Sequence, residues 1–239
     1  MQTQTEHDSE DYLASHYIHR SNWLRAAVLG ANDGILSTAS IAIGIAAASH
    51  HREPVILATL AGLVAGALSM AAGEYVSVSS QTDIEKADIE REQQELLEMP
   101  EIELLRLAEI YEKRGLKKET ALTVAHELTE HDALGAHVRD ELGLNEISQA
   151  NPIQAALASG ASFTVGGLLP LLATIFLPVK SMEYYLYASA LLFLILLGTM
   201  AAKAGGSSVT KAILRISFWG TAAMGLTALV GYLFGVKLA

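Results

Sequence analysis

Apolar residues along this chain form five long runs, separated by short polar stretches and by one long acidic stretch. A helix needs about 20 apolar residues to cross the roughly 30 Å of hydrocarbon in a bilayer, and each run is of that order. The pattern therefore predicts an all-α membrane protein with five transmembrane helices. The runs cover about Trp23–Ser49, Val55–Met70, Ile153–Leu177, Glu183–Ala202 and Ile213–Phe234.

The second apolar run passes into an acidic run with nothing between them that would break a helix. No Gly or Pro occurs between Gly73 and Pro100. One continuous helix is the simplest interpretation, with its acidic half outside the membrane. We accordingly divide the chain into a tail (1–22), the first two spans (23–79), an acidic insert (80–152) and the last three spans (153–239).

The insert itself shows three helical segments. The first is Gln81–Glu98, and the second runs from Glu101, directly after Pro100, to about Arg114 before Gly115. The third runs from about Glu119 to Leu142 before Gly143. Pro at a helix start and Gly after its end are typical boundaries. We expect a three-helix insert between the second and third spans.

Charge is segregated into this insert. The chain has 239 residues, 51% of them hydrophobic, and a net charge of -10. Residues 80–152 hold 18 Asp and Glu against 8 Lys and Arg, whereas the remainder holds 8 of each sign. An acidic insert argues against nucleic acid and favours metal cations as partners, although a solvated acidic surface is an equally common explanation. The absence of cysteine excludes disulfides, thiolate metal sites and thiol catalysis.

The distribution of basic residues predicts the orientation. The N-terminus lacks the basic start, apolar core and cleavage site of a signal peptide, so we expect it in the cytoplasm. With it inside, 13 Lys and Arg lie on the inner side and 3 on the outer side. The positive-inside rule then places the insert in the cytoplasm and the C-terminus outside.

Three residues in the first two spans are candidates for handling an ion. Asp33 lies within the first apolar run, where a carboxylate costs about 2.5–3.5 kcal/mol and usually faces a partner or an aqueous path. The alternative is that Asp33 caps a helix broken at Asn32-Asp33-Gly34. Met70 and Glu74 are four residues apart and share a helix face, with packing and a headgroup carboxylate as their ordinary explanations.

Carboxylates and histidines recur on all three predicted helices of the insert. Helical bundles hold iron or manganese with such ligands projecting from neighbouring helices. His137 and Glu141 are four residues apart and can converge on one ion, as can Glu127 and His131. Any single one of these residues is more often a surface group, so the metal-site hypothesis depends on all three helices contributing.

Several sequence motifs together resemble the vacuolar iron transporter family. They are NDG in the first span, GALSMAAGEYVSVSSQTD after the second, REQQELLEMP and ELGL in the insert, and GGLLPLL in the third span. The resemblance extends from about Trp23 to the C-terminus. It implies a homodimer of five-span subunits that moves Fe2+, and often Mn2+, out of the cytosol in exchange for protons. It further implies a pore between subunits and a cytoplasmic helical domain that collects metal.

The resemblance also assigns metal-binding residues by position. Arg106 stands where plant members have a further metal-binding glutamate, His137 where they have a methionine, and Gly62 where they have a transmembrane glutamate. Glu74 is a candidate to replace part of that last role. The candidate metal residues are Asp33, Met70 and Glu74 in the pore and Glu92, Glu95, Glu103, His137 and Glu141 in the insert.

The sequence therefore predicts a secondary transporter rather than an enzyme. It needs no cofactor, and its partners are transported Fe2+ or Mn2+, protons, membrane lipid and a second copy of the chain. The short tail and the resemblance suggest a bacterial inner membrane. Two alternatives stay open, namely a membrane-anchored metal sensor or storage protein and a di-iron oxidase. The paired Glu-x-x-His spacing that such an oxidase uses does not occur in the insert.

Overall fold

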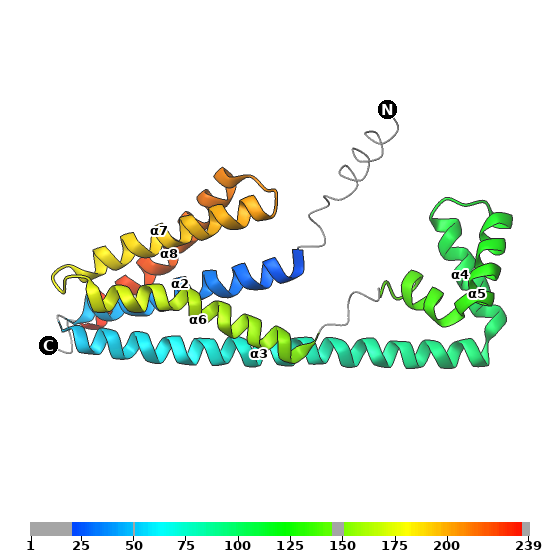
Figure 1. Cartoon of the computed structure of the whole chain (residues 1–239), viewed down its shortest axis with the longest axis horizontal. Coiled ribbons are helices and arrows are strands. Elements are labelled where there is room, and N and C mark those ends of the chain that lie inside the picture. Colours follow the sequence, from blue (N-terminus) through cyan, green and yellow to red (C-terminus); the bar gives the residue numbers. More distant parts are fainter. Residues whose placement is uncertain (1–20, 50, 145–150, 236–239) are drawn as a thin grey trace, which may run out of the picture. The chain divides into compact units, whose positions relative to one another are not determined.

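The computed structural model describes residues 21–49, 51–144 and 151–235, and these contain helices and no strand (Figure 1). Five of the helices are long and apolar enough to cross a membrane, so the predicted all-α fold with five spans is confirmed. The predicted tail, 1–22, lies almost wholly outside the described residues. The helices are α2 (Ser21–Ala48), α3 (Arg52–Glu98), α4 (Pro100–Lys113), α5 (Lys118–Asp140), α6 (Pro152–Phe176), α7 (Met182–Ala204) and α8 (Val209–Gly235).

Helix α3 is unbroken over 47 residues, as the absence of Gly and Pro after Gly73 predicted. At about 1.5 Å per residue it is roughly 70 Å long, more than twice the hydrocarbon thickness of a bilayer. Its apolar first part therefore spans the membrane, and its acidic second part lies outside it. The chain forms two compact units, one containing residues up to Glu74 and from Gln154 onward, the other Tyr75–Ile153.

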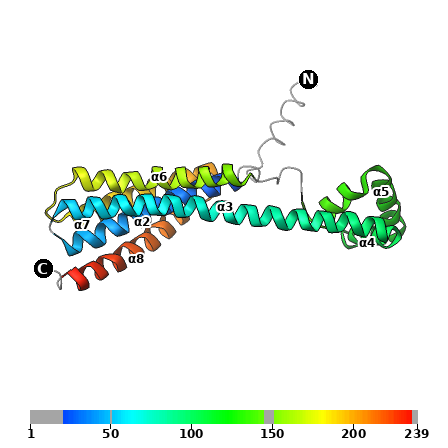
Figure 2. The same ribbon diagram turned by 90° about the horizontal axis from the view of Figure 1, so that it is seen from below.

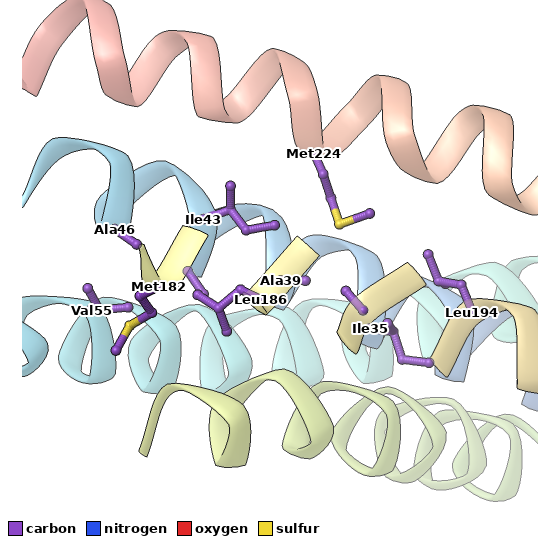
Figure 3. Packing of buried hydrophobic residues seen from close by; sticks show 11 residues of the cluster. Ile35, Ala39, Ile43, Ala46, Val55, Met182, Leu186, Leu194 and Met224 are labelled. Atoms are coloured by element: carbon purple, nitrogen blue, oxygen red, sulfur yellow. The ribbon is translucent and has the colours of Figure 1, made fainter. Parts of the chain in front are cut away.

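The core of the membrane unit lies along one side of α2. Ile35, Ala39 and Ile43 on that helix are at most 2% exposed and pack against α7 and α8. Leu186 of α7 and Met224 of α8 point into the same cluster (Figure 3). Two views show α2, α6, α7, α8 and the first part of α3 side by side (Figures 1 and 2). Small residues alternate with large ones here, which lets the helices approach closely.

Glycines set the approach of α2 to α6. A Cβ on Gly34 would lie 2.1 Å from the carbonyl oxygen of Phe163, and one on Gly166 would lie 2.2 Å from that of Ala31. Helix α2 continues through Asn32-Asp33-Gly34, so the alternative that Asp33 caps a broken helix is wrong. Gly166, Gly167 and Pro170 in the third span would be expected to interrupt a helix, but α6 runs on through them to Phe176 with Pro170 inside it. Both glycines serve helix contact rather than helix termination.

The start of α3 is tied to the end of α6 by one arginine. The guanidinium of Arg52 donates hydrogen bonds to the carbonyl oxygens of Ile175 and, at 2.7 Å, of Leu177. The last carbonyls of a helix have no partner within the helix, and a cation there also interacts favourably with the helix dipole. Arg52 therefore fixes the start of α3 against the C-terminal end of α6.

The second unit has a small core of its own. Leu107 and Ala108 of α4 pack against Ala125 and Ala136 of α5, and all four are at most 3% exposed. Helix α4 begins at Pro100 and is followed by Gly115 at a φ of +101°, which ends it where the sequence predicted. The insert is thus a packed helical unit around α4, α5 and the end of α3.

Replacing Gly34 with alanine should destabilise the membrane unit, because the new Cβ meets backbone that has no room to move. We expect a loss of about 1–3 kcal/mol, seen as a lower thermal unfolding midpoint of the detergent-solubilised protein. Gly225→Ala is the matched control, since nothing lies within 4 Å of a Cβ built there. Equal midpoints for the two variants would show that the close α2–α6 contact is not required.

Candidate metal site

Acidic and imidazole side chains from three helices meet inside the insert. Glu92 comes from α3, Glu103 from α4, and His137 and Glu141 from the end of α5. One ligand atom from each lies within 4.8 Å of every other. Glu92, Glu103 and His137 are at most 3% exposed. The structure thus brings together four of the five insert residues that the sequence put forward.

The three carboxylates surround one nitrogen of the imidazole. His137 Nδ1 is 2.9 Å from Oε1 of Glu92, 3.0 Å from Oε2 of Glu141 and 4.0 Å from Oε2 of Glu103. The contact between Nδ1 and Glu141 has the geometry of a hydrogen bond. Oε1 of Glu92 has no hydrogen-bond partner among the described residues, despite its short distance to Nδ1. His137 Nε2 is likewise buried without a hydrogen-bond partner among the described residues. Buried polar atoms in this condition usually serve a ligand, an ion or water.

This arrangement has the dimensions and the chemistry of a divalent cation site. Metal–ligand bonds of about 2.0–2.2 Å place neighbouring ligand atoms about 3–4.4 Å apart. The observed separations of up to 4.8 Å need only a small contraction. Carboxylate oxygen with one imidazole nitrogen suits first-row transition metals of intermediate softness. The spacing and the chemistry of these ligand atoms are therefore compatible with one such ion.

Electrostatics within the site favour a cation. Burial raises the pKa of the Glu92 carboxyl, and the negative charge of Glu141 raises it further. Carboxylates that crowd together without solvent repel one another, and a divalent cation relieves that repulsion. The same crowding makes the cluster costly for a purely structural role.

Glu95, the fifth candidate in the insert, is outside the group of four. Its carboxylate pairs with Arg91 at 2.9 Å and with Arg106 at 3.5 Å, and its side chain is 22% exposed. The hydrogen bond from Arg91 lowers the pKa of Glu95. Glu95 therefore lies at the rim, where two arginines already neutralise it.

A break in α5 aims His137 and Glu141 at the site, and the sequence analysis missed it. The predicted continuous third helix is wrong at Asp132, which has non-helical angles (φ -161°, ψ 89°). Its Oδ1 accepts a hydrogen bond from the backbone N–H of Gly135 at 3.0 Å, which is an N-cap for a second helical segment. The available signal in the sequence was Asp132 itself, because aspartate is a preferred N-cap residue and here follows a polar run and precedes Ala133 and Leu134.

The second segment is fastened to α4 by one buried carboxylate. Asp140, with a side chain 7% exposed, accepts hydrogen bonds from Tyr111 Oη at 2.9 Å and Arg114 Nη1 at 2.6 Å. Both partners belong to the end of α4 and the turn after it. This contact fixes the residue directly before Glu141 and so helps to position that ligand.

Other candidate pairs of the insert do not converge. Glu127 and His131 are exposed, and neither joins a group of three or more possible ligands in the part of the chain that the structure describes. His126 pairs with Glu130 at 3.4 Å on the surface. Residues four positions apart share a face wherever they occur on a helix, so the spacing alone does not identify a site. Of these pairs, only His137 with Glu141 lies on the face of α5 that packs against the other helices of the insert.

The three pore candidates lie on two helices of the membrane unit. Asp33 is half-buried on α2, and its backbone carbonyl accepts a hydrogen bond from Ser37 Oγ at 2.5 Å. Met70 packs at the edge of a cluster formed by Leu63 and Phe163, and Glu74 is half-buried one turn further along α3. No group of three or more carboxylates and imidazoles forms around Asp33 or Glu74 within residues 21–49, 51–144 and 151–235.

A cavity of about 720 Å³ in the membrane unit lies on another side of α2. Asn32, Leu36, Leu194 and Trp219 are among its lining residues, and Asp33 is not. Most of its lining is apolar, which suits an acyl chain better than a metal ion. It is therefore separate from the candidate ion path.

Comparison with known proteins identifies the family of the chain. The sequence matches the VIT family over residues 24–232. The chain belongs to the VIT family. A relative from Acanthamoeba castellanii named vacuolar iron transporter is 42% identical over 217 residues, covering 89% of this chain and 79% of the relative. Vacuolar iron transporter homolog 1 of Oryza sativa is 38% identical, covering 92% and 77%, and homolog 2 of Arabidopsis thaliana is 36% identical, covering 92% and 90%.

Membership in the VIT family confirms the resemblance that the motifs indicated. It identifies the chain as a membrane protein of a transporter family rather than as an enzyme. The family match covers both the membrane unit and the insert, because residues 24–232 include α3 to α7 and nearly all of α2 and α8. The carboxylate cluster is therefore part of the family region.

Removing the cap at Asp132 should loosen the segment that carries His137 and Glu141. Asp132→Ala loses the side-chain acceptor, which is worth about 1 kcal/mol, so amide hydrogen exchange over residues 133–140 should accelerate about fivefold. Asp132→Asn is the matched control, because asparagine removes the charge but caps about equally well. Equal exchange rates in the alanine and asparagine variants would contradict a capping role.

Proposed function

We propose that this protein transports Fe2+ or Mn2+ out of the cytosol in exchange for protons. The observation that carries the proposal is the buried group of Glu92, Glu103, His137 and Glu141, attached through α3 to a five-span membrane unit. The relatives' names supply the class of cargo, since they are vacuolar iron transporters or homologues of these. Transport rather than storage agrees with a carboxylate at Asp33 within a membrane-spanning helix.

The donor set supports iron and manganese as the cargo. Oxygen and imidazole ligands suit both ions, and with no cysteine in the chain the soft thiolates that favour copper or zinc are absent. Carboxylates and imidazole must be unprotonated to bind metal, so proton entry from the outer side would weaken a metal site in the membrane. In the proposed path the insert collects the ion, which then passes Glu74 and Met70 to reach Asp33.

A homodimer with the insert in the cytoplasm is part of the proposal. One copy offers the pore only Asp33, Met70 and Glu74, and a two-fold axis between subunits would double this set. The first part of α3 presents an exposed apolar face suited to such a contact, with Leu57 70% exposed, Val64 52% and Leu68 67%. The excess of Lys and Arg on the insert side favours the cytoplasmic orientation.

A metal sensor or storage protein is the competing function, because the insert site alone would serve it equally well. The two differ in whether metal crosses the membrane. A di-iron oxidase would instead consume oxygen when Fe2+ is added, and four ligand atoms within 4.8 Å of one another suit one ion better than a bridged pair. Oxygen uptake measured with Fe2+ therefore separates this third possibility.

Proteoliposomes with an acidic interior should accumulate Fe2+ and Mn2+, and Asp33→Ala should reduce uptake to the level of protein-free vesicles. The carboxylate is the only charged candidate ligand that α2 brings into the membrane, so no neighbour on that helix can replace it. Glu53→Ala is the matched control, because it removes one carboxylate from the start of α3. Full uptake by Asp33→Ala, or uptake independent of the pH gradient, would contradict the proposed mechanism.

Replacing Glu92, Glu95 and Glu103 together with glutamine should raise the metal concentration needed for half-maximal uptake by about tenfold. The maximal rate should change less, because the insert collects the ion before the membrane path carries it. The control triple variant replaces the exposed residues Glu90, Glu101 and Glu112, which removes the same charge from the same helices. An equal rise in the half-maximal metal concentration in both variants would show that the insert attracts metal only through its overall negative charge.

A further inference from the structure

One cation of the protein itself lies against the candidate metal site. Arg106 Nη1 donates to both oxygens of Glu103 at 3.3 and 3.4 Å, and its Nε is 3.2 Å from Oε1 of Glu141. The same Nη1 reaches Oε2 of Glu95 at 3.5 Å. A single guanidinium thus contacts two residues of the four-residue group and the carboxylate at its rim.

These contacts engage oxygens that a metal ion would need. Glu141 directs Oε2 to His137 and Oε1 to Arg106, and Glu103 has both of its oxygens within hydrogen-bond distance of Arg106. A metal ion and a guanidinium on the same carboxylates repel each other and compete for the same lone pairs. A guanidinium stays protonated in proteins, so this competitor always carries its positive charge.

Arg106 is also placed so that it can leave. Its side chain is 46% exposed, whereas those of Glu103 and His137 are 2% and 0% exposed. A half-exposed arginine exchanges its protein contacts for water at low cost, while buried ligands cannot move away. The long contacts of 3.2–3.5 Å are weaker than close charge-assisted hydrogen bonds, which are typically about 2.7–2.9 Å.

We propose that Arg106 is a built-in competitor of the transported cation, which withdraws from Glu103 and Glu141 when metal binds and returns when metal leaves. It neutralises the carboxylates before capture, and it weakens the affinity of the site so that the ion is passed on rather than retained. This inference rests on the proposed function, because it concerns how tightly that same site holds its cargo. Arg106 acts on the metal through its contacts with Glu103 and Glu141 and is not itself a ligand.

The competition predicts that removing the guanidinium tightens metal binding. In Arg106→Gln the affinity of the insert for Mn2+ should rise about tenfold, because the ion no longer displaces a bound charge. Arg106→Lys keeps the charge without the forked geometry and should fall between the two. Mn2+ binding to the full-length protein in detergent is measured by loss of the free-ion electron paramagnetic resonance signal.

The matched control is Lys113→Gln. It removes the same charge from the same helix, α4, but Lys113 pairs with the exposed Glu109 at 2.9 Å rather than with Glu103 or Glu141. Long-range attraction of Mn2+ changes by a similar amount in both variants, so only local competition distinguishes them. We expect Lys113→Gln to stay within about twofold of the parent protein.

A second readout separates competition from a structural role. Without metal, Arg106→Gln should unfold at a lower temperature than the parent, because three carboxylates lose their counter-charge. With Mn2+ its midpoint should rise by more than that of the parent, since the shift follows the affinity for the folded state. A residue that only held the helices together would lower both midpoints equally and would not tighten binding.

The outcomes distinguish this inference from the proposed function. Tighter binding in Arg106→Gln than in Lys113→Gln supports the competition, including the case in which the parent binds too weakly to detect. Equal or weaker binding overturns it and leaves the metal site standing. Binding that survives Glu92→Gln, Glu95→Gln and Glu103→Gln together refutes the insert as the metal site, and both proposals fall with it.

Discussion

Repulsion between buried carboxylates is the constraint on which the insert depends. Glu92, Glu103 and Glu141 come from three helices and meet around His137 Nδ1, where little water remains to screen their charges. Such a cluster is costly unless a cation or a bound proton balances its charge. Arg106 supplies one positive charge from the rim, and a divalent ion would supply two from the centre. This need for balance is the physical basis of the proposed metal binding.

Helix α3 contributes residues to both compact units. Its first part packs through Val55 and Leu63 into the membrane unit, and its last turns carry Glu92 into the insert. Met70 and Glu74, the candidate pore residues, and Glu92 of the candidate metal site therefore belong to one continuous helix.

Within the membrane unit, close packing takes the place of the hydrophobic effect. Lipid tails are as apolar as leucine, so helices gain stability from backbone approach and from contacts of small residues. Gly34 and Gly166 provide that approach between α2 and α6, and alanines along α2 provide it toward α7 and α8. Asp33 lies next to Gly34, where α2 meets the backbone of α6. Its position is therefore held by the α2–α6 contact.

The sequence by itself determined the five spans, the unbroken α3 and the ends of α4, because these follow from local periodicity and from where Pro and Gly occur. It also supplied four residues that converge, through motifs shared with the VIT family. Only the tertiary structure decided that Glu95 lies at the rim, that Glu127 and His131 stay on the surface, and that Arg106 contacts the site. Those facts depend on which faces three helices bury and on the break at Asp132, and packing across helices leaves no periodic signal along the chain.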